Sequence, residues 1–191
     1  MEIPVFPALI SAFLGLVFGV LPGILARFGL RPGAKFAVIS DIAKGAAACG
    51  AAWAAGAGGF GMAVAGAFVL FAHNFSPFVR PRGCGAAVAL GTALTINPLP
   101  AALWALMWLT GYGAIRRERV VGNLAGTFGT GILIATTPDP LLRLTTFPPD
   151  IPPTLITMLT LVVCLQLFLR IIPDARELFR RLREEPDEPK T

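Results

Sequence analysis

Long apolar stretches separated by short polar segments fill most of the sequence, and the first of them, residues 3–26, carries no charge. A helix needs about 20 predominantly apolar residues to cross the hydrocarbon layer of a membrane. A cleaved signal peptide has basic residues before its apolar run, whereas the first basic residue here, Arg27, follows the run. The first stretch is therefore expected to be a retained membrane helix. Seven such segments are expected, at residues 3–26, 36–57, 60–72, 86–96, 98–112, 120–136 and 152–172.

The third and fourth segments are shorter than the others. Residues 60–72 and 86–96 are each too short to cross a bilayer upright. We interpret them as half-helices around a re-entrant turn, which is tolerated only where protein or water covers the backbone. The predicted fold class is all-α: a polytopic integral membrane protein with about seven transmembrane helices, two of them short.

The composition supports a membrane protein. Hydrophobic residues make up 55% of the 191 residues and charged residues only 14%, whereas about a quarter of a soluble domain is charged and a disordered chain has low hydrophobicity. Of the 27 charged residues, 11 lie between Asp174 and Lys190. We therefore divide the chain into a transmembrane domain, residues 1–173, and a charged cytoplasmic tail, residues 174–191. The tail is expected to begin as a basic amphipathic helix on the inner membrane surface and to end disordered.

The basic residues predict an orientation. If the N-terminus is outside, 14 of the 16 Lys and Arg residues fall in inner loops or the tail. Lys44 is then within the membrane, and only Arg143 lies outside. Cytoplasmic loops are enriched in Lys and Arg, so the N-terminus is predicted outside and the C-terminus in the cytoplasm. The net charge of +5 is accordingly attributed to loops that face anionic lipid, and no nucleic-acid partner is expected.

Two ionisable residues lie inside the second segment. Asp41 and Lys44 are three residues apart, so they share one face of a helix. Ionisable groups at this depth are costly and are usually paired or functional. Two interpretations remain open: a lysine that extends toward the membrane surface and neutralises Asp41, or a polar wall that binds an anionic substrate.

The strongest group of candidate residues lies at the inner end of the third segment. A helix that begins after a glycine turn presents N–H groups to an anion. Arginines add charge-assisted contacts to phosphate oxygens, and a histidine supplies a general base or a hydrogen-bond donor. The candidates are His73 as the catalytic residue and Asp41, Lys44, Asn74, Arg80, Arg82, Gly83 and Gly85 as substrate-binding residues.

A plainer interpretation of the same stretch is a basic loop that only sets topology, with a buried histidine that holds a turn. A thiol nucleophile at Cys84 is a weaker alternative. The three scattered cysteines and the single histidine exclude a disulfide framework and a multi-histidine metal site, and no cofactor is expected.

Four stretches of the sequence are similar to one family of membrane enzymes. They are Gly19-Val20-Leu21-Pro22 with Leu25-Ala26-Arg27, Asp41-Ile42-Ala43-Lys44-Gly45, residues 72–85, and Gly111-Tyr112-Gly113. Together they resemble the bacterial PlsY family, the glycerol-3-phosphate acyltransferases that use acyl phosphate. The resemblance covers most of the chain. The family positions that are kept are Asp41, Lys44, Gly45, His73, Pro77, Arg80, Arg82 and Gly83.

The resemblance implies a function in phospholipid biosynthesis. An acyl chain would pass from acyl phosphate to the 1-hydroxyl of glycerol 3-phosphate and give lysophosphatidate, without a metal or an acyl-enzyme intermediate. The implied partners are acyl phosphate, glycerol 3-phosphate and membrane lipids. The implied location is the bacterial inner (plasma) membrane.

The sequence departs from the family pattern in three places. The family's Gly-Ser-Gly-Asn loop between the first two helices is replaced by a short connection, residues 28–35. The family's Gly-Gly-Lys reads Gly83-Cys84-Gly85, and its C-terminal Arg-His-x-x-Asn-Ile pattern is not recognisable around residues 170–176. Two other functions are therefore considered: a catalytically degenerate paralogue that acts as a lipid-binding or scaffold subunit, and a small transporter, which the lack of an internal repeat disfavours.

Overall fold

The computed structural model describes residues 5–27, 34–76, 85–114 and 117–184. Every regular element in these ranges is an α-helix, which confirms the all-α prediction. The helices are α1 (Val5–Arg27), α2 (Ala34–Ala54), α3 (Gly58–Phe75), α4 (Ala86–Ile96), α5 (Pro98–Ala114), α6 (Arg119–Thr136), α7 (Asp139–Thr145) and α8 (Pro153–Glu184).

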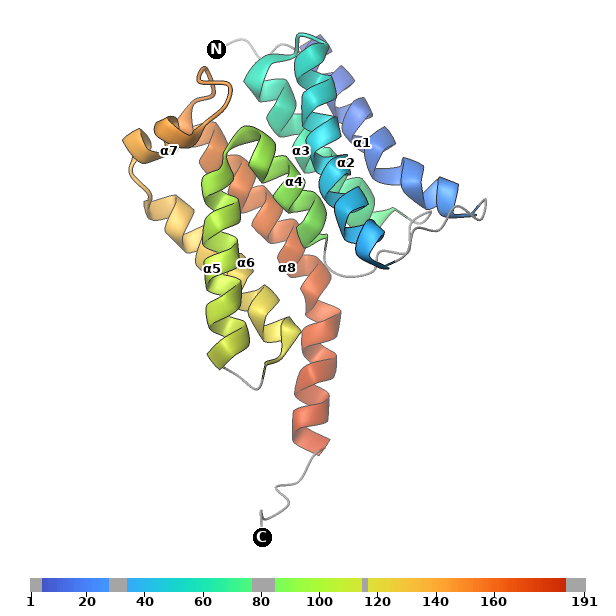
Figure 1. Ribbon diagram of the computed structural model, residues 1–191, viewed down its shortest axis with the longest axis vertical. Coiled ribbons are helices and arrows are strands. Elements are labelled where there is room, and N and C mark those ends of the chain that lie inside the picture. The colour runs from blue at the N-terminus through green and yellow to red at the C-terminus, as the bar shows by residue number, and fades with distance from the viewer. Residues whose placement is uncertain (1–4, 28–33, 77–84, 115–116, 185–191) are drawn as a thin grey trace.

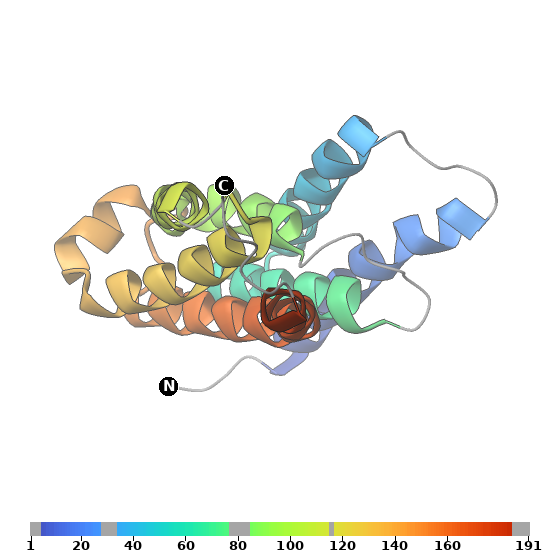
Figure 2. The same ribbon diagram turned by 90° about the horizontal axis from the view of Figure 1, so that it is seen from below.

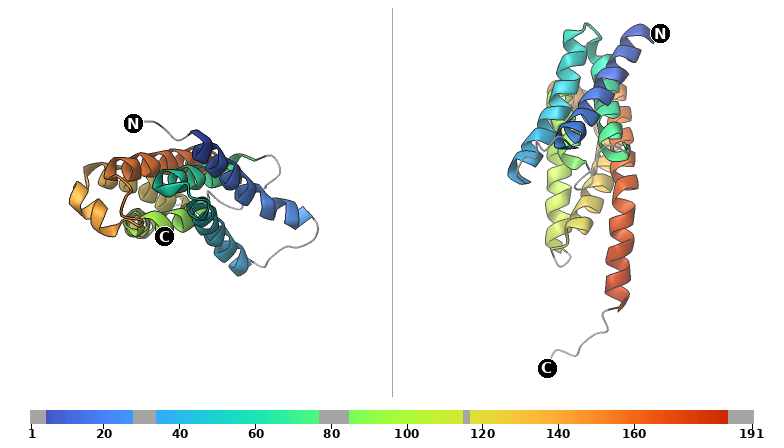
Figure 3. Two further views of the ribbon diagram at one scale, coloured as in Figure 1. Left: turned by 90° about the horizontal axis from the view of Figure 1, so that it is seen from above. Right: turned by 90° about the vertical axis from the view of Figure 1, so that its right-hand side faces the viewer.

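The helices run up and down along one axis (Figure 1). Helices α1 to α6 alternate in direction, the short α7 turns by 113° from the axis of α6, and α8 returns along the bundle. We call the end of the bundle where α7 lies and α8 begins the α7 end. The opposite end, toward which α8 runs, is called the tail end. Seen along the axis, the cross-section of the bundle is elongated (Figures 2 and 3).

Small residues let neighbouring helices approach closely. A Cβ at Gly15 or Gly19 of α1 would overlap backbone or Cβ atoms of α3. Such small-residue contacts are typical of helices that pack in a bilayer, where little hydrophobic force draws helices together. The same device joins α2 to α4, through Gly45 and Gly91. These contacts fix α3 and α4 against α1 and α2.

Large apolar side chains face outward on several helices. Phe6, Leu9 and Phe13 of α1 are all more than 60% exposed. Such exposure is unusual over so many residues in a soluble protein, but it is expected where lipid surrounds the helices. The described helices therefore have the surface of a membrane protein.

By length and composition, two of the described helices are able to cross a membrane, α3 and α8. The bent pair of α6 and α7 makes a third if it is counted as one span. The prediction that residues 60–72 form a short half-helix is wrong, because α3 has 18 residues and continues through His73, Asn74 and Phe75. The fourth segment is as short as expected, since α4 has 11 residues.

Helix α8 crosses the proposed boundary at residue 173 without a break. It has 32 residues and contains Pro173, and it is therefore about 48 Å long. The hydrocarbon layer is only about 30 Å thick, so part of α8 extends past the rest of the bundle at the tail end, as Figure 3 shows. The division of the chain at this position stays a prediction.

A buried asparagine organises the α7 end. The side-chain Nδ2 of Asn97, between α4 and α5, donates to the carbonyl oxygen of Leu142 at 3.0 Å and to Oγ1 of Thr146 at 2.8 Å. Its Oδ1 accepts hydrogen bonds from Leu99 N at 2.9 Å and Thr145 Oγ1 at 3.0 Å. Asn97 is only 1% exposed, and these four bonds satisfy its amide. They hold α7 against the turn between α4 and α5.

Candidate functional site

Asp41 and Lys44 of α2 form an ion pair. Lys44 Nζ donates to Asp41 Oδ1 at 2.5 Å. The side chains are 10% exposed for Lys44 and 24% for Asp41. Both side chains are largely shielded from solvent, where an unpaired charge carries a large desolvation cost. Each charge is therefore stabilised by the other. The residue after Lys44 is Gly45, at which α2 packs on α4.

His73 and Asn74 lie in the last turn of α3, and both are buried. Among the described residues, neither Nδ1 of His73 nor the amide Oδ1 and Nδ2 of Asn74 has a hydrogen-bond partner. Buried polar groups are normally paired, because an unpaired one costs free energy. Three orphaned polar atoms on adjacent residues are therefore a mark of a ligand-binding site.

Gly85 places the start of α4 against Asn74. Its φ is +79°, in the left-handed region that favours glycine. A Cβ at this position would also overlap both amide atoms of Asn74, so the position requires glycine on two grounds. The first N–H groups of an α-helix have no intrahelical partner and carry partial positive charge. Asn74 thus lies beside a helix N-terminus that is able to attract an anion.

Helix α8 adds a residue that the sequence did not single out. Gln166 donates from Nε2 to the carbonyl oxygen of Ala67 at 3.3 Å, which fixes α8 against α3. One turn further along, Nε of Arg170 is buried with no partner in the described ranges. From the sequence alone, Arg170 is only one of the 14 basic residues assigned to the cytoplasmic side. The available signal was its position among apolar residues, Leu169 and Ile171, because a charge in such a stretch marks a functional residue by default.

These groups form one electrostatic unit. The charges of Asp41, Lys44 and Arg170 all act on the imidazole of His73. Two of them are positive and one is negative, so the unit has an excess positive charge, to which the N-terminus of α4 adds. We call Asp41, Lys44, His73, Asn74 and Arg170 the polar cluster. It is suited to a ligand that carries a negative charge.

Of the predicted site residues, Asp41, Lys44, His73, Asn74 and Gly85 are thus brought together. Arg80, Arg82 and Gly83 lie outside the described residues, as does Cys84. Within the described ranges, no group of three or more His, Cys, Asp and Glu side chains is arranged to hold a metal ion.

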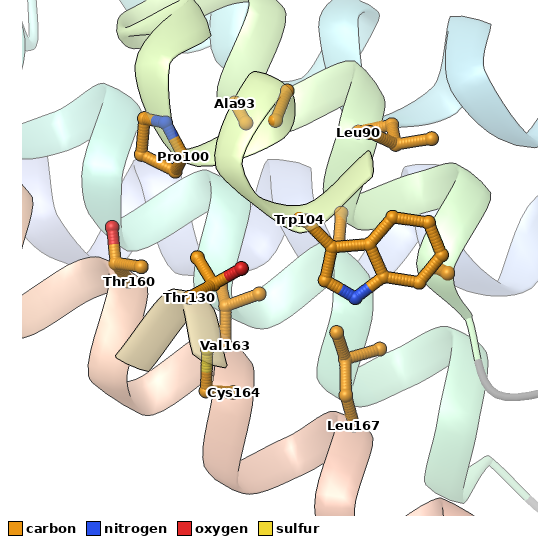
Figure 4. Close-up of a pocket in the computed structure, with 12 residues that line it drawn as sticks. Leu90, Ala93, Pro100, Trp104, Thr130, Thr160, Val163, Cys164 and Leu167 are labelled. Carbon is orange, nitrogen blue, oxygen red and sulfur yellow. The ribbon is translucent and has the colours of Figure 1, made fainter. Parts of the chain in front are cut away.

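An apolar cavity of about 40 Å³ lies between α4, α5, α6 and α8 (Figure 4). It begins at Ala86, directly after Gly85, and at Leu167, three residues before Arg170. Its walls come from four helices: Ala86, Ala89, Leu90 and Ala93 of α4, Pro100, Ala101 and Trp104 of α5, Thr130 of α6, and Thr160, Val163, Cys164 and Leu167 of α8. The cavity thus lies along α4 and α8, the two helices that follow Gly85 and carry Arg170.

Comparison with known protein families shows to which family the chain belongs. A family model described as glycerol-3-phosphate acyltransferase matches residues 10–182. The chain belongs to the PlsY family. No curated protein and no solved structure matches it.

The description of the PlsY family model names the acceptor of the reaction. The acceptor of a glycerol-3-phosphate acyltransferase carries a phosphate, and the group transferred is an acyl chain. The match extends from α1 into the tail-end part of α8, so it includes every residue of the polar cluster and of the cavity wall. It confirms the family that the four motif stretches predict.

Proposed function

We propose that the protein transfers an acyl chain from acyl phosphate to the 1-hydroxyl of glycerol 3-phosphate and releases lysophosphatidate and inorganic phosphate. The observation that carries the proposal is the polar cluster beside the N-terminus of α4, in a chain of this family. Both substrates are phosphate esters or anhydrides with negative charge. Binding them in one place is therefore the main task of the site.

The phosphate groups are assigned to the positive side of the cluster. Lys44 and Arg170 supply positive charge, and the α4 N-terminus supplies N–H groups. The amide of Asn74 is free of partners in the described structure, and it lies against Gly85 at this N-terminus. Asp41 orients Lys44 through the ion pair. Arg80, Arg82 and Gly83 are proposed as further phosphate contacts on the strength of the family resemblance.

The chemical step needs one proton acceptor. The 1-hydroxyl oxygen of glycerol 3-phosphate forms a bond to the acyl carbonyl carbon, and the bond from that carbon to the phosphate oxygen breaks. The phosphate leaves with the electrons of the broken bond, and the hydroxyl proton passes to His73. Its Nδ1 has no partner among the described residues, so it is available for this role.

The site is proposed to face the cytoplasm, with seven membrane crossings and the C-terminus inside. Helix α3 ends, and α4 and α6 begin, toward the tail end, in the same direction in which α8 leads to its arginines (Figure 1). Basic residues accumulate on the cytoplasmic side of a membrane. The bacterial inner membrane follows from the family resemblance.

The test is acyl transfer by the purified protein in lipid nanodiscs. Palmitoyl phosphate and labelled glycerol 3-phosphate should give labelled lysophosphatidate and an equal amount of inorganic phosphate. Palmitoyl coenzyme A in place of palmitoyl phosphate should give none. Binding of both substrates without any product would favour the catalytically degenerate paralogue, and activity only with coenzyme A would refute the acyl-phosphate donor.

Two matched pairs of arginine variants test the assignment of the site. Arg170→Ala should raise the KM for glycerol 3-phosphate about tenfold or more, the scale of a lost charge-assisted hydrogen bond. Arg176→Ala, on the same helix but exposed, should leave it near the wild-type value. The same contrast is expected between Arg80→Ala and Arg116→Ala, because the sequence predicts both arginines on the cytoplasmic side but only Arg80 in the candidate phosphate site. Equal effects within a pair would mean that only the general positive charge matters.

A further inference from the structure

The side-chain amide of Gln166 in α8 has one paired and one unpaired atom. Its Nε2 donates to the carbonyl oxygen of Ala67 in α3 at 3.3 Å. Its Oε1 is buried and has no hydrogen-bond partner among the described residues. Only the NH₂ group of an amide donates to a carbonyl, so the bond to Ala67 fixes which way this amide points. The acceptor Oε1 is therefore left for a donor other than Ala67.

A buried donor without a partner lies one turn further along the same helix. It is Nε of Arg170, which has no hydrogen-bond partner in the described ranges. Residues four apart on an α-helix are neighbours on its surface, with about 5–6 Å between their Cβ atoms. An unpaired buried acceptor and an unpaired buried donor each cost free energy. One hydrogen bond from Arg170 Nε to Gln166 Oε1 would remove both costs.

The amide of Gln166 also ties Arg170 to the helix that carries His73. Helices α3 and α8 both run toward the tail end (Figure 1). His73 follows Ala67 by six residues and Arg170 follows Gln166 by four, which are about 9 Å and about 6 Å of helix. Arg170 thus lies within one helical turn of the level of His73, and the bond between Gln166 and Ala67 holds the two helices in this register.

We propose that Gln166 is a positioning residue: its Oε1 accepts a hydrogen bond from Nε of Arg170 and so directs the guanidinium toward the phosphate of glycerol 3-phosphate. This inference rests on the proposed function. With Nε held, the two Nη groups of the planar guanidinium remain for the phosphate oxygens. A guanidinium that is already oriented loses less conformational freedom when it binds. Gln166 acts through Arg170 and touches neither substrate.

The test is a double-mutant cycle, measured as binding of glycerol 3-phosphate to the purified protein in nanodiscs. Gln166→Met conserves the size of the side chain and removes the acceptor, and it should weaken binding about fivefold. When Arg170→Ala is already present, the same change should weaken binding by about twofold at most, because no guanidinium is left to orient. Equal weakening in the two backgrounds is the result of a purely structural glutamine and overturns the proposal, as does unchanged binding by Gln166→Met.

The control is the loss of another hydrogen bond between two helices. Asn123→Ala removes the bond from Trp108 Nε1, which joins α5 to α6. It should leave binding of glycerol 3-phosphate within about twofold of the wild type. A loss as large as that of Gln166→Met would show that weakening any helix contact impairs binding, and it would overturn the specific role of Gln166.

Melting temperatures supply a second test, which needs no ligand. Gln166→Glu keeps an acceptor oxygen in place and, as a carboxylate, should pair with Arg170. Arg170→Ala should therefore lower the melting temperature more in the Gln166→Glu protein than in the wild type, because it leaves a buried carboxylate unpaired. An equal or smaller loss in the Gln166→Glu protein would show that the two side chains do not meet, and it would overturn the proposal.

Acyl transfer measured on the same preparations separates this proposal from the proposed function. A wild type that binds glycerol 3-phosphate without transferring an acyl chain refutes the proposed function, and the binding cycle still decides the role of Gln166. An active wild type with equal weakening in both backgrounds keeps the proposed function and overturns the role of Gln166. No binding of glycerol 3-phosphate by the wild type overturns that role as well.

Discussion

Gly45 of α2 and Gly91 of α4 face each other where the two helix backbones touch. A Cβ at Gly91 would overlap the carbonyl oxygen of Ile42, and one at Gly45 would overlap that of Val88. The contact lies one residue from Lys44 and thus ties the Asp41–Lys44 pair to α4, whose N-terminus adjoins Asn74. Two glycines therefore determine how far the ion pair lies from the rest of the site.

Gly91→Ala should destabilise the protein by about 1–3 kcal/mol, because neither backbone at this contact is free to move away. Thermal unfolding in detergent measures the effect. The control is Gly50→Ala, in the partner helix α2, where a Cβ meets nothing within 4 Å. That change should be neutral or slightly stabilising, since alanine favours a helix more than glycine does. Equal melting temperatures for the two variants would contradict the close contact of α2 with α4.

Asp41→Asn should cost about 1–3 kcal/mol or more, because Lys44 is left without its counter-charge in a part-buried position. The double variant Asp41→Asn with Lys44→Met should regain much of that loss, since no isolated charge remains. Glu177→Gln is the control for an exposed carboxylate and should change stability little. An unchanged melting temperature for Asp41→Asn would show that the pair is not a stabilising one.

Asn97→Ala should be more damaging than Asn123→Ala. The first removes four hydrogen bonds and leaves the N–H of Leu99 without its side-chain partner, at about 1–3 kcal/mol for an unpaired buried group. The second removes one bond, from Trp108 Nε1, and should cost about 0.5–1.5 kcal/mol. Chemical unfolding in mixed detergent ranks the two, and the reverse order would refute the role of Asn97 at the α7 end.

The proposed orientation predicts which positions a membrane-impermeant thiol reagent reaches in intact cells. Leu144→Cys, 82% exposed at the α7 end, should be labelled from outside. Arg117→Cys and Arg181→Cys, at the tail end, should be labelled only after the membrane is opened, because basic residues favour the cytoplasmic side. Labelling of either from outside would overturn the orientation.

Helix positions were largely predictable because apolar runs reflect burial in lipid or protein. The fourth segment has the bounds of α4 itself, and the sixth differs from α6 by one residue. The third segment was predicted too short, because the polar residues His73 and Asn74 end its apolar run. The helix nevertheless continues through both residues. Helix α7 was not predicted, because the residues between the sixth and seventh segments are rich in proline and resemble a loop. Proline in a first helical turn starts a helix as readily as it marks a loop.

The candidate site was predictable only where its members are near in sequence. The spacing of Asp41 and Lys44 indicates a shared helix face, and the ion pair has that geometry. The contribution of Arg170 was not predictable, because its approach to His73 depends on how α8 packs on α3. The same is true of the cavity, whose walls combine four helices. Periodicity within one segment carries no information on such distant contacts.

The hydrogen bonds of Asn97 also impose an order on the formation of the bundle. Two of its partners, Leu142 and Thr146, come 45 and 49 residues later in the chain. When the protein is made from its N-terminus, the turn between α4 and α5 exists before any of these partners. An amide without partners is costly away from water, so this turn stays hydrated until α6 has crossed back and α7 has docked. Closure of the α7 end is therefore a late event in biogenesis, and it waits for the last third of the chain.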